Sequence, residues 1–139
     1  MTIQEIQEEI INEFKIFDNW LERNNYLIKL GKELPPIDSK YKTDENLIKG
    51  CQVKTWFHST FKDGKVFYEI DSSSLIIRGI IALLIKVLSG QKPEDIKNAE
   101  LYFIDKIGLR ENFSPLRANS LWKVVNQMKS VAILYETGK

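Results

Sequence analysis

The residue in this sequence best suited to chemistry is Cys51, the chain's only cysteine. Gly50 precedes it, and glycine adopts backbone angles that other residues reach only with strain, so we expect the thiol at a bend. Lys49 and Lys54 lie close by in the sequence, and positive charge near a thiol favours the reactive thiolate. The pattern predicts a thiol at a tight turn, where strand-like sequence begins at Val53.

The residue types alone leave three roles open for Cys51. Free cysteine is among the most frequently buried residues and packs as a small hydrophobic side chain, so an inert core position is the simplest interpretation. The second interpretation is a reactive thiol, and the third is a redox sensor. A sensor often has a second, resolving cysteine, which this sequence does not contain.

Composition excludes several other functions. A single cysteine cannot form an internal disulfide, cannot supply the four ligands of a structural zinc site, and falls short of the several thiolates that hold an iron–sulfur cluster. The 20 basic and 19 acidic residues are scattered and give a net charge of +1. The sequence therefore has no cluster of positive charge of the kind that binds nucleic acid. We therefore expect neither a resident metal nor nucleic-acid binding.

The sequence predicts no membrane segment and no export signal. The N-terminus is acidic at Glu5 and lacks the basic and apolar regions of a signal peptide. The longest apolar block, residues 75–88, is too short to span a bilayer and contains Arg78 and Lys86. We expect one domain over residues 1–139 in a reducing, cytoplasmic setting.

Two helices are expected before the cysteine. Apolar residues recur every three or four positions over residues 3–17, after a capping-box motif at residues 2–5. Asp18 is the expected cap of a second helix, and Gly31 is its expected end. A proline pair then stops helical structure, and an irregular segment leads to the cysteine turn.

Residues 53–70 are expected to form a β-hairpin, because Asp63-Gly64 is a strong two-residue turn signal. Strand alternation places one set of side chains on a single face: Val53, Thr55, Phe57, Phe61, Val66, Tyr68 and Ile70. The same alternation, extended back to Cys51, points the thiol toward this apolar face. Burial there would raise the thiol's pKa and the nearby lysines would lower it, so the sign of the net shift stays open.

His58, the only histidine, has two possible roles. It could act as a base or ligand near Cys51. Alternation instead places it on the opposite face of the hairpin, across from Glu69, so a cross-strand polar pair is the simpler interpretation.

Helical patterns return after the hairpin. Serines within residues 72–74 can cap a largely apolar helix over residues 75–88, the expected centre of the core. Pro93 starts a further short helix, and another helical piece is expected to end at Gly108. Ser114-Pro115 opens the last helix. Helices on both sides of a small antiparallel hairpin in the sequence predict an α+β fold.

Four segments, in order, resemble the SufE family, the sulfur acceptors of iron–sulfur cluster biogenesis. Residues 41–52, YKTDENLIKGCQ, resemble the active-site region around the family's cysteine, and residues 30–35 resemble its LGxxLP element. Residues 71–82 resemble its DSxxxIxxG helix start, and residues 114–121 resemble its SPxRxxGL element. Together the four collinear segments extend over most of the chain.

Three residues depart from the family pattern. Val53 stands where the family usually has serine, Ser120 where it usually has glycine, and Ser73 where some members carry an acid. None of them replaces the cysteine, so the departures concern only the surroundings of Cys51.

The resemblance implies that Cys51 accepts sulfur from a cysteine desulfurase of the SufS or CsdA kind, stimulates that enzyme and passes the sulfur to an iron–sulfur scaffold or another acceptor. The pyridoxal phosphate belongs to the desulfurase, and this chain needs no cofactor. The implied fold is SufE- and IscU-like, with room for a third strand. Loop support or partner binding is implied for Lys49, Gly50, Gln52, Asp71 and Arg117. A non-covalent activator and a redox sensor remain as alternative functions.

Overall fold

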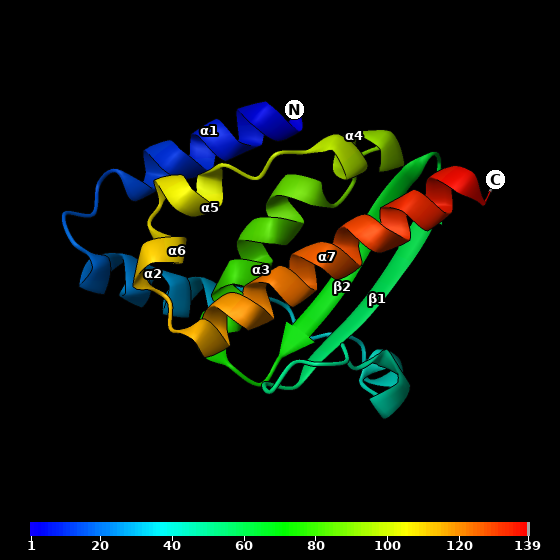
Figure 1. The fold of residues 1–139 in the computed structure, drawn as a ribbon, viewed down its shortest axis with the longest axis horizontal. Helices are drawn as coiled ribbons and strands as arrows, with labels where there is room; N and C mark the ends of the chain where they lie inside the picture. The colour runs from blue at the N-terminus through cyan, green and yellow to red at the C-terminus, as the bar shows by residue number, and fades with distance from the viewer. Residues whose placement is uncertain (139) are drawn as a thin grey trace.

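The computed structural model describes residues 1–138 and begins with helix α1 (Ile3–Phe14) (Figure 1). The expected capping box is present: the Glu5 N–H donates to the Thr2 hydroxyl, and the Thr2 N–H donates to the Glu5 carboxylate at 2.8 Å. The helix ends at Phe14, three residues earlier than the apolar pattern predicted, because Phe17 packs against the core from the following turn.

Helix α2 (Trp20–Glu33) corrects two details of the sequence prediction. Its N-cap is Asn19, not Asp18, because the Asn19 side chain accepts a hydrogen bond from the Glu22 N–H at 3.0 Å. Gly31 does not end the helix, which continues to its C-cap at Leu34.

Gly31 instead allows α2 to cross closely over helix α3 (Leu75–Leu88). A Cβ atom on Gly31 would lie 2.1 Å from the Leu75 carbonyl oxygen, and one on Gly79 would lie 2.0 Å from the Leu27 carbonyl oxygen. Both distances are far inside van der Waals contact, so the crossing requires glycine on each helix. Helix α3 occupies the predicted range, is capped by Ser74 and is buried along most of its length.

The hairpin consists of β1 (Thr55–Lys62) and β2 (Lys65–Ser72), and its predicted register is confirmed. Phe57 pairs with Ile70 and Lys62 with Lys65 across the two-residue turn, where Asp63 and Gly64 both have positive φ. Two positive φ angles in succession give the turn the twist that suits a hairpin.

One face of the hairpin is buried as alternation predicted, with two differences at its ends. Thr55, Phe57, Val66, Tyr68 and Ile70 are buried, but Phe61 near the turn is 38% exposed. The strand also begins at Thr55, so Val53 belongs to the preceding loop. Phe61 still contacts the last helix of the chain, because its ring stacks on that of Tyr135 with centroids 5.2 Å apart.

Four further helices follow: α4 (Pro93–Asn98), α5 (Phe103–Lys106), α6 (Leu109–Asn112) and α7 (Pro115–Thr137). Gly108 has a φ of 87° and separates α5 from α6, so the helical piece that was expected to end there resumes immediately after it. Helix α7 is capped by Ser114 and packs against α4 and the hairpin.

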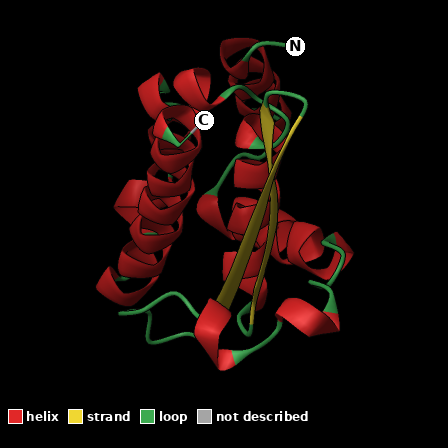
Figure 2. Cartoon of the chain, turned by 90° about the vertical axis from the view of Figure 1, so that its right-hand side faces the viewer, coloured by secondary structure: helices red, strands yellow, loops and turns green. Residues whose placement is uncertain are grey.

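The molecule is α+β, with α3 and α7 on the same face of the two-stranded sheet (Figures 1 and 2). A third strand is not formed within the described chain. Leu47 makes a single antiparallel bridge to Trp56, next to two short 3-10 turns, η1 (Ser39–Tyr41) and η2 (Asp44–Asn46). None of the helices within residues 1–138 has both the length and the apolar character needed to cross a membrane.

Candidate functional site

Cys51 lies on a loop between the Leu47 bridge and the start of β1, directly after a turn. Gly50 has a φ of 84°, a conformation that side-chain-bearing residues adopt only with strain. The prediction of a thiol at a glycine turn is therefore confirmed.

Backbone hydrogen bonds anchor both ends of this loop. The Ile48 N–H donates to the Thr55 carbonyl at 2.9 Å, and the Ser73 N–H donates to the Lys54 carbonyl at 3.0 Å. The loop thus leaves and rejoins the sheet at defined points, while its middle projects beyond the hairpin.

The first turns of α7 cover the middle of the loop. The side-chain amide of Asn119 donates to the Gly50 carbonyl at 3.2 Å. A Cβ atom on Gly50 would lie 3.1 Å from Lys123 Nζ, so the lysine side chain packs directly over the turn. Ser120, between them on the helix, is fully buried.

The surroundings of Cys51 determine the direction of the thiol's net pKa shift, which the sequence left open. The thiol is half-buried, and this burial is the largest influence on it, so its pKa is raised above the ordinary cysteine value. The positive charge of Lys123 and the nearby hydroxyls of Ser120 and Thr55 act in the opposite direction and limit the rise in pKa. The lysine that acts on the thiol in this way comes from α7, far from Cys51 in the sequence.

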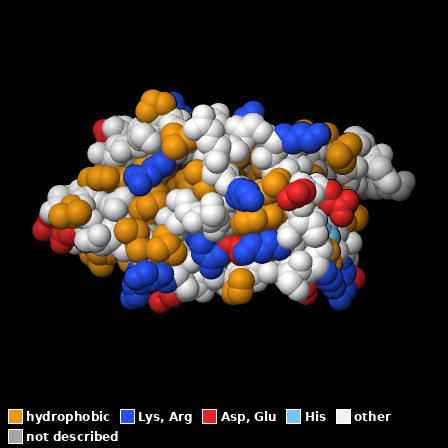
Figure 3. All heavy atoms as spheres, turned by 90° about the horizontal axis from the view of Figure 1, so that it is seen from below, with side chains coloured by type: hydrophobic (Ala, Val, Ile, Leu, Met, Phe, Trp, Pro, Cys, Tyr) orange, Lys and Arg blue, Asp and Glu red, His pale blue; other side chains and the backbone are white. Residues whose placement is uncertain are grey.

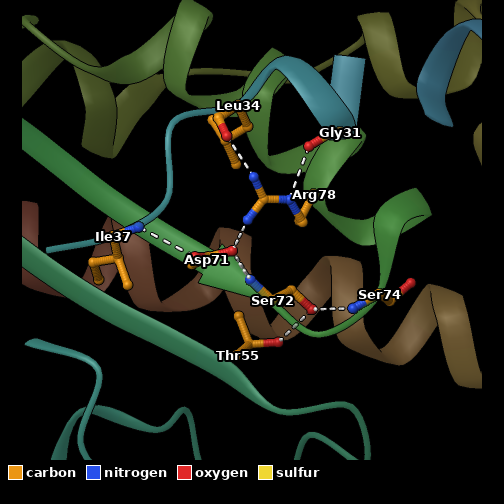
Figure 4. Close-up of polar contacts among 8 residues, drawn as sticks. All are labelled: Gly31, Leu34, Ile37, Thr55, Asp71, Ser72, Ser74 and Arg78. Atoms are coloured by element: carbon orange, nitrogen blue, oxygen red, sulfur yellow. Dashed lines mark hydrogen bonds and ion pairs between the residues drawn. The ribbon is translucent and has the colours of Figure 1, made fainter. Parts of the chain in front are cut away.

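Asp71, near the end of β2, is buried and accepts several hydrogen bonds (Figure 4). Its carboxylate accepts from the Ile37 N–H at 3.1 Å and from the Ser72 N–H at 2.7 Å, and it forms an ion pair with Arg78. A buried carboxylate needs such partners, because desolvation of the charge is otherwise uncompensated.

Arg78 uses the rest of its guanidinium to hold the segment after α2. Its Nε donates to the Gly31 carbonyl at 2.8 Å, and its Nη2 donates to the Leu34 carbonyl (Figure 4). The Asp71–Arg78 pair therefore joins β2, α3 and the end of α2 beneath the base of the hairpin.

A hydroxyl pair continues this network toward the cysteine loop. Thr55, opposite Ser72 in the hairpin, donates to the Val53 carbonyl at 3.1 Å, and its Oγ1 lies 3.4 Å from Ser72 Oγ. Asp71 is thus connected to the Cys51 loop indirectly, through Ser72 and Thr55.

The remaining sequence-predicted site residues lie on the surface. Lys49 and Gln52, on either side of the Gly50–Cys51 turn, are exposed. Arg117 is also exposed, in the first turn of α7, and its guanidinium makes no hydrogen bond or ion pair within residues 1–138. The structure thus places these three side chains at the surface and Asp71 in the buried network. Their roles in partner binding or loop support stay predictions.

His58 is paired with Glu69 in the hairpin register, as predicted. Its ring stacks on Tyr41 of η1, with centroids 3.5 Å apart and planes 10° from parallel. This stacking fixes η1 against the solvent face of β1.

A groove of about 470 Å³ lies beside the cysteine turn, between residues 45–49 and the middle of α7. It is lined by Glu45, Asn46, Leu47, Ile48, Lys49, Phe57, Lys123, Asn126, Gln127 and Ser130. On the face of the molecule shown in Figure 3, separate Lys and Arg side chains lie among hydrophobic ones, without one large patch of a single charge.

Sequence patterns did not identify four further residues at the site: Arg78, Asn119, Ser120 and Lys123. Ser120 carried a signal, because it replaces the glycine usual in the resembled element. Arg78 lies within another resembled segment. Asn119 and Lys123 carried no local signal, since only the packing of α7 brings them to the loop.

The fold and this site define a class of protein: a small α+β molecule that carries one half-buried thiol on a loop held between a hairpin and a helix. Comparison of this chain with known proteins identifies the family to which it belongs. Residues 8–132 match the family described as SufE, Fe-S metabolism associated domain, and the chain belongs to that family.

Individual relatives agree with this assignment. An uncharacterized SufE-like protein of Rhizobium meliloti is 35% identical over 130 residues, which cover 90% of this chain and 93% of the relative. A protein of Wigglesworthia glossinidia brevipalpis named cysteine desulfuration protein SufE is 31% identical and is covered to 86% of its length, with 88% of this chain. The solution structure of a hypothetical protein from Thermus thermophilus has the same fold, with a TM-score of 0.73, 22% identity, and coverage of 92% of this chain and 93% of that one.

Proposed function

We propose that the chain is a sulfur acceptor for a cysteine desulfurase that uses pyridoxal phosphate, with Cys51 as the accepting group. The Cys51 thiolate attacks the outer sulfur of a persulfide on the desulfurase cysteine. A new S–S bond forms at Cys51, the old S–S bond breaks, and its electron pair leaves on the desulfurase cysteine as a thiolate. The exchange follows thiol–disulfide chemistry and needs no external oxidant or reductant.

One observation carries the proposal: the sole thiol of a SufE-family chain is half-buried on a glycine turn that is anchored at both ends. A persulfide is prone to oxidation and exchange, so partial burial beside α7 would protect it between encounters. Because the turn itself carries few hydrogen bonds, it can expose the sulfur when a partner docks.

The proposed contacts with the desulfurase involve exposed residues. Lys49 and Gln52 flank the thiol, and Arg117 begins the helix that covers it. We assign these side chains to contacts with a desulfurase of the SufS or CsdA kind. An iron–sulfur scaffold or another acceptor then takes the sulfur, and the free thiol suits a reducing, cytoplasmic setting.

Intact-mass spectrometry tests the function. The protein is incubated with a cysteine desulfurase and free cysteine, and its mass is measured with and without a reductant. We expect a reducible gain of one sulfur atom in the native protein and no gain in Cys51→Ser. Absence of any gain with several desulfurases would exclude the acceptor role.

The raised pKa of Cys51 favours a second candidate, a non-covalent activator that stimulates the desulfurase by docking, because less thiolate is present at neutral pH. The same variant separates the two functions. If Cys51→Ser still stimulates the desulfurase fully and the native protein gains no sulfur, the chain is an activator. A redox sensor is disfavoured by the same raised pKa, since oxidation follows thiolate character.

A further inference from the structure

Ser120 is an anomaly in the core beside the cysteine. Its side chain is fully buried, and its hydroxyl makes no hydrogen bond of normal geometry within the described chain. Buried hydroxyls are nearly always paired, so an unpaired one in a native fold calls for a functional explanation. Its neighbour Asn119 donates to the Gly50 carbonyl at 3.2 Å, and Lys123 packs over Gly50, so this part of α7 lies against the Cys51 turn. The Ser120 hydroxyl accordingly lowers the pKa of the thiol.

Among the two hydroxyls that influence Cys51, only that of Ser120 has its proton free. Thr55 Oγ1 donates its single proton to the Val53 carbonyl at 3.1 Å. A neutral thiol is a weak acceptor, whereas a sulfur anion accepts strongly. The Ser120 hydroxyl therefore gains its missing partner when Cys51 loses a proton.

Lys123 follows Ser120 by three residues, so it lies on the same side of α7. Its Nζ lies 3.1 Å from the position that a Cβ atom on Gly50 would take, and the residue is only partly exposed. The other charged side chains at the adjoining groove, Glu45 and Lys49, are exposed. Lys123 is thus the least solvated charge beside the thiol.

We propose that Ser120 and Lys123 form an anion-stabilising site for the sulfur of Cys51, in which the hydroxyl donates to the sulfur anion and the ammonium balances its charge. The inference rests on the proposed sulfur transfer, and in it both residues act directly on the reacting sulfur. Their interactions strengthen only when the sulfur is charged, so they favour the attacking thiolate over the resting thiol. They also offset the burial that otherwise suppresses the thiolate.

The test measures the rate of Cys51 alkylation by iodoacetamide against pH, with no desulfurase present. The midpoint of the pH profile reports the acidity of the thiol, while the plateau at high pH reports its accessibility. We expect the midpoint to rise in Lys123→Met and in Ser120→Ala, with about three- to tenfold slower alkylation at pH 8. Lys123→Arg keeps the charge and should restore the midpoint toward the native value.

The matched control is Lys54→Met, which removes one lysine that is close to Cys51 in sequence but exposed. Its midpoint should move much less than that of Lys123→Met. Urea unfolding checks the fold, and Ser120→Ala should be at least as stable as the native protein, because it removes an unpaired buried hydroxyl. Unchanged midpoints in both Ser120→Ala and Lys123→Met overturn the proposal. Because no desulfurase is used, this result is independent of whether Cys51 accepts sulfur.

Discussion

The side-chain amide of Asn119 donates a hydrogen bond of 3.2 Å to the carbonyl of Gly50, a residue 69 positions away in the chain. Gly50 directly precedes the only cysteine. The backbone groups of residues 49–53 make no backbone-to-backbone hydrogen bonds in the described chain. The side chain of an exposed residue on α7 thus holds the middle of the cysteine loop in place.

Asn119→Ala should loosen this loop. Loss of one such hydrogen bond costs about 0.5–1.5 kcal/mol, which predicts about two- to tenfold faster alkylation of Cys51 if exposure limits the reaction. The measurement is the plateau alkylation rate at high pH. Asn126→Ala, an exposed asparagine farther along the same helix, is the control and should react at the native rate. Equal rates in the two variants would show that the hydrogen bond does not restrain the loop.

Gly50→Ala should destabilise the protein more than Gly64→Ala. Both glycines have positive φ, so each substitution carries a similar backbone cost of about 1–2 kcal/mol. A Cβ atom on Gly64 would meet nothing within 4 Å, whereas one on Gly50 would crowd Lys123 at 3.1 Å. Urea unfolding of both variants measures the difference, and a smaller loss for Gly50→Ala would contradict the close packing of Lys123 on the turn.

The buried Asp71–Arg78 pair should matter far more to stability than an exposed pair. Breaking a buried ion pair by removing one partner costs about 3–5 kcal/mol, which is expected for Arg78→Met. Arg110→Met removes the same group from the exposed Asp105–Arg110 pair and should cost about 1 kcal/mol or less. The free energies of unfolding in urea give both values, and similar losses would refute the proposed anchoring role.

The Cys51 thiol should make stability depend on alkaline pH. Its pKa is raised by burial, so the folded protein keeps the thiol proton at a pH where the unfolded chain has lost it. The free energy of unfolding should therefore fall, relative to Cys51→Ser, as pH rises from the pKa of the unfolded thiol to that of the folded one. Parallel stability curves for the two proteins across this window would mean that burial does not raise the pKa.

Docking of a desulfurase should open the cysteine loop. Gly50 supplies a flexible position, and the half-buried thiol must leave the shelter of α7 to reach another cysteine. Hydrogen exchange over residues 46–53 should become faster when a desulfurase is added, while exchange within α3 stays constant. Unchanged exchange in the loop, with binding shown separately, would argue for transfer to a thiol that is already accessible.

Local features of the sequence predicted much of the fold. Asp63-Gly64 determined the hairpin register because a two-residue turn allows only one pairing, and the apolar run of residues 75–88 became the core helix. Gly31 was misjudged, because glycine serves equally at a helix end and at a close helix crossing. Only the Leu75 carbonyl on α3 distinguishes the two uses.

The candidate site, like the fold, was predicted from the sequence only in part. The sequence by itself determined the candidate atom for the proposed chemistry, since the chain has only one thiol, and it determined the glycine turn that carries this thiol. Only the tertiary structure decided the surroundings of that thiol. Lys49 and Lys54 are its neighbours in sequence, yet Lys123 and Ser120 act on it, because α7 packs across the loop and electrostatic and hydrogen-bond interactions depend on distance in space.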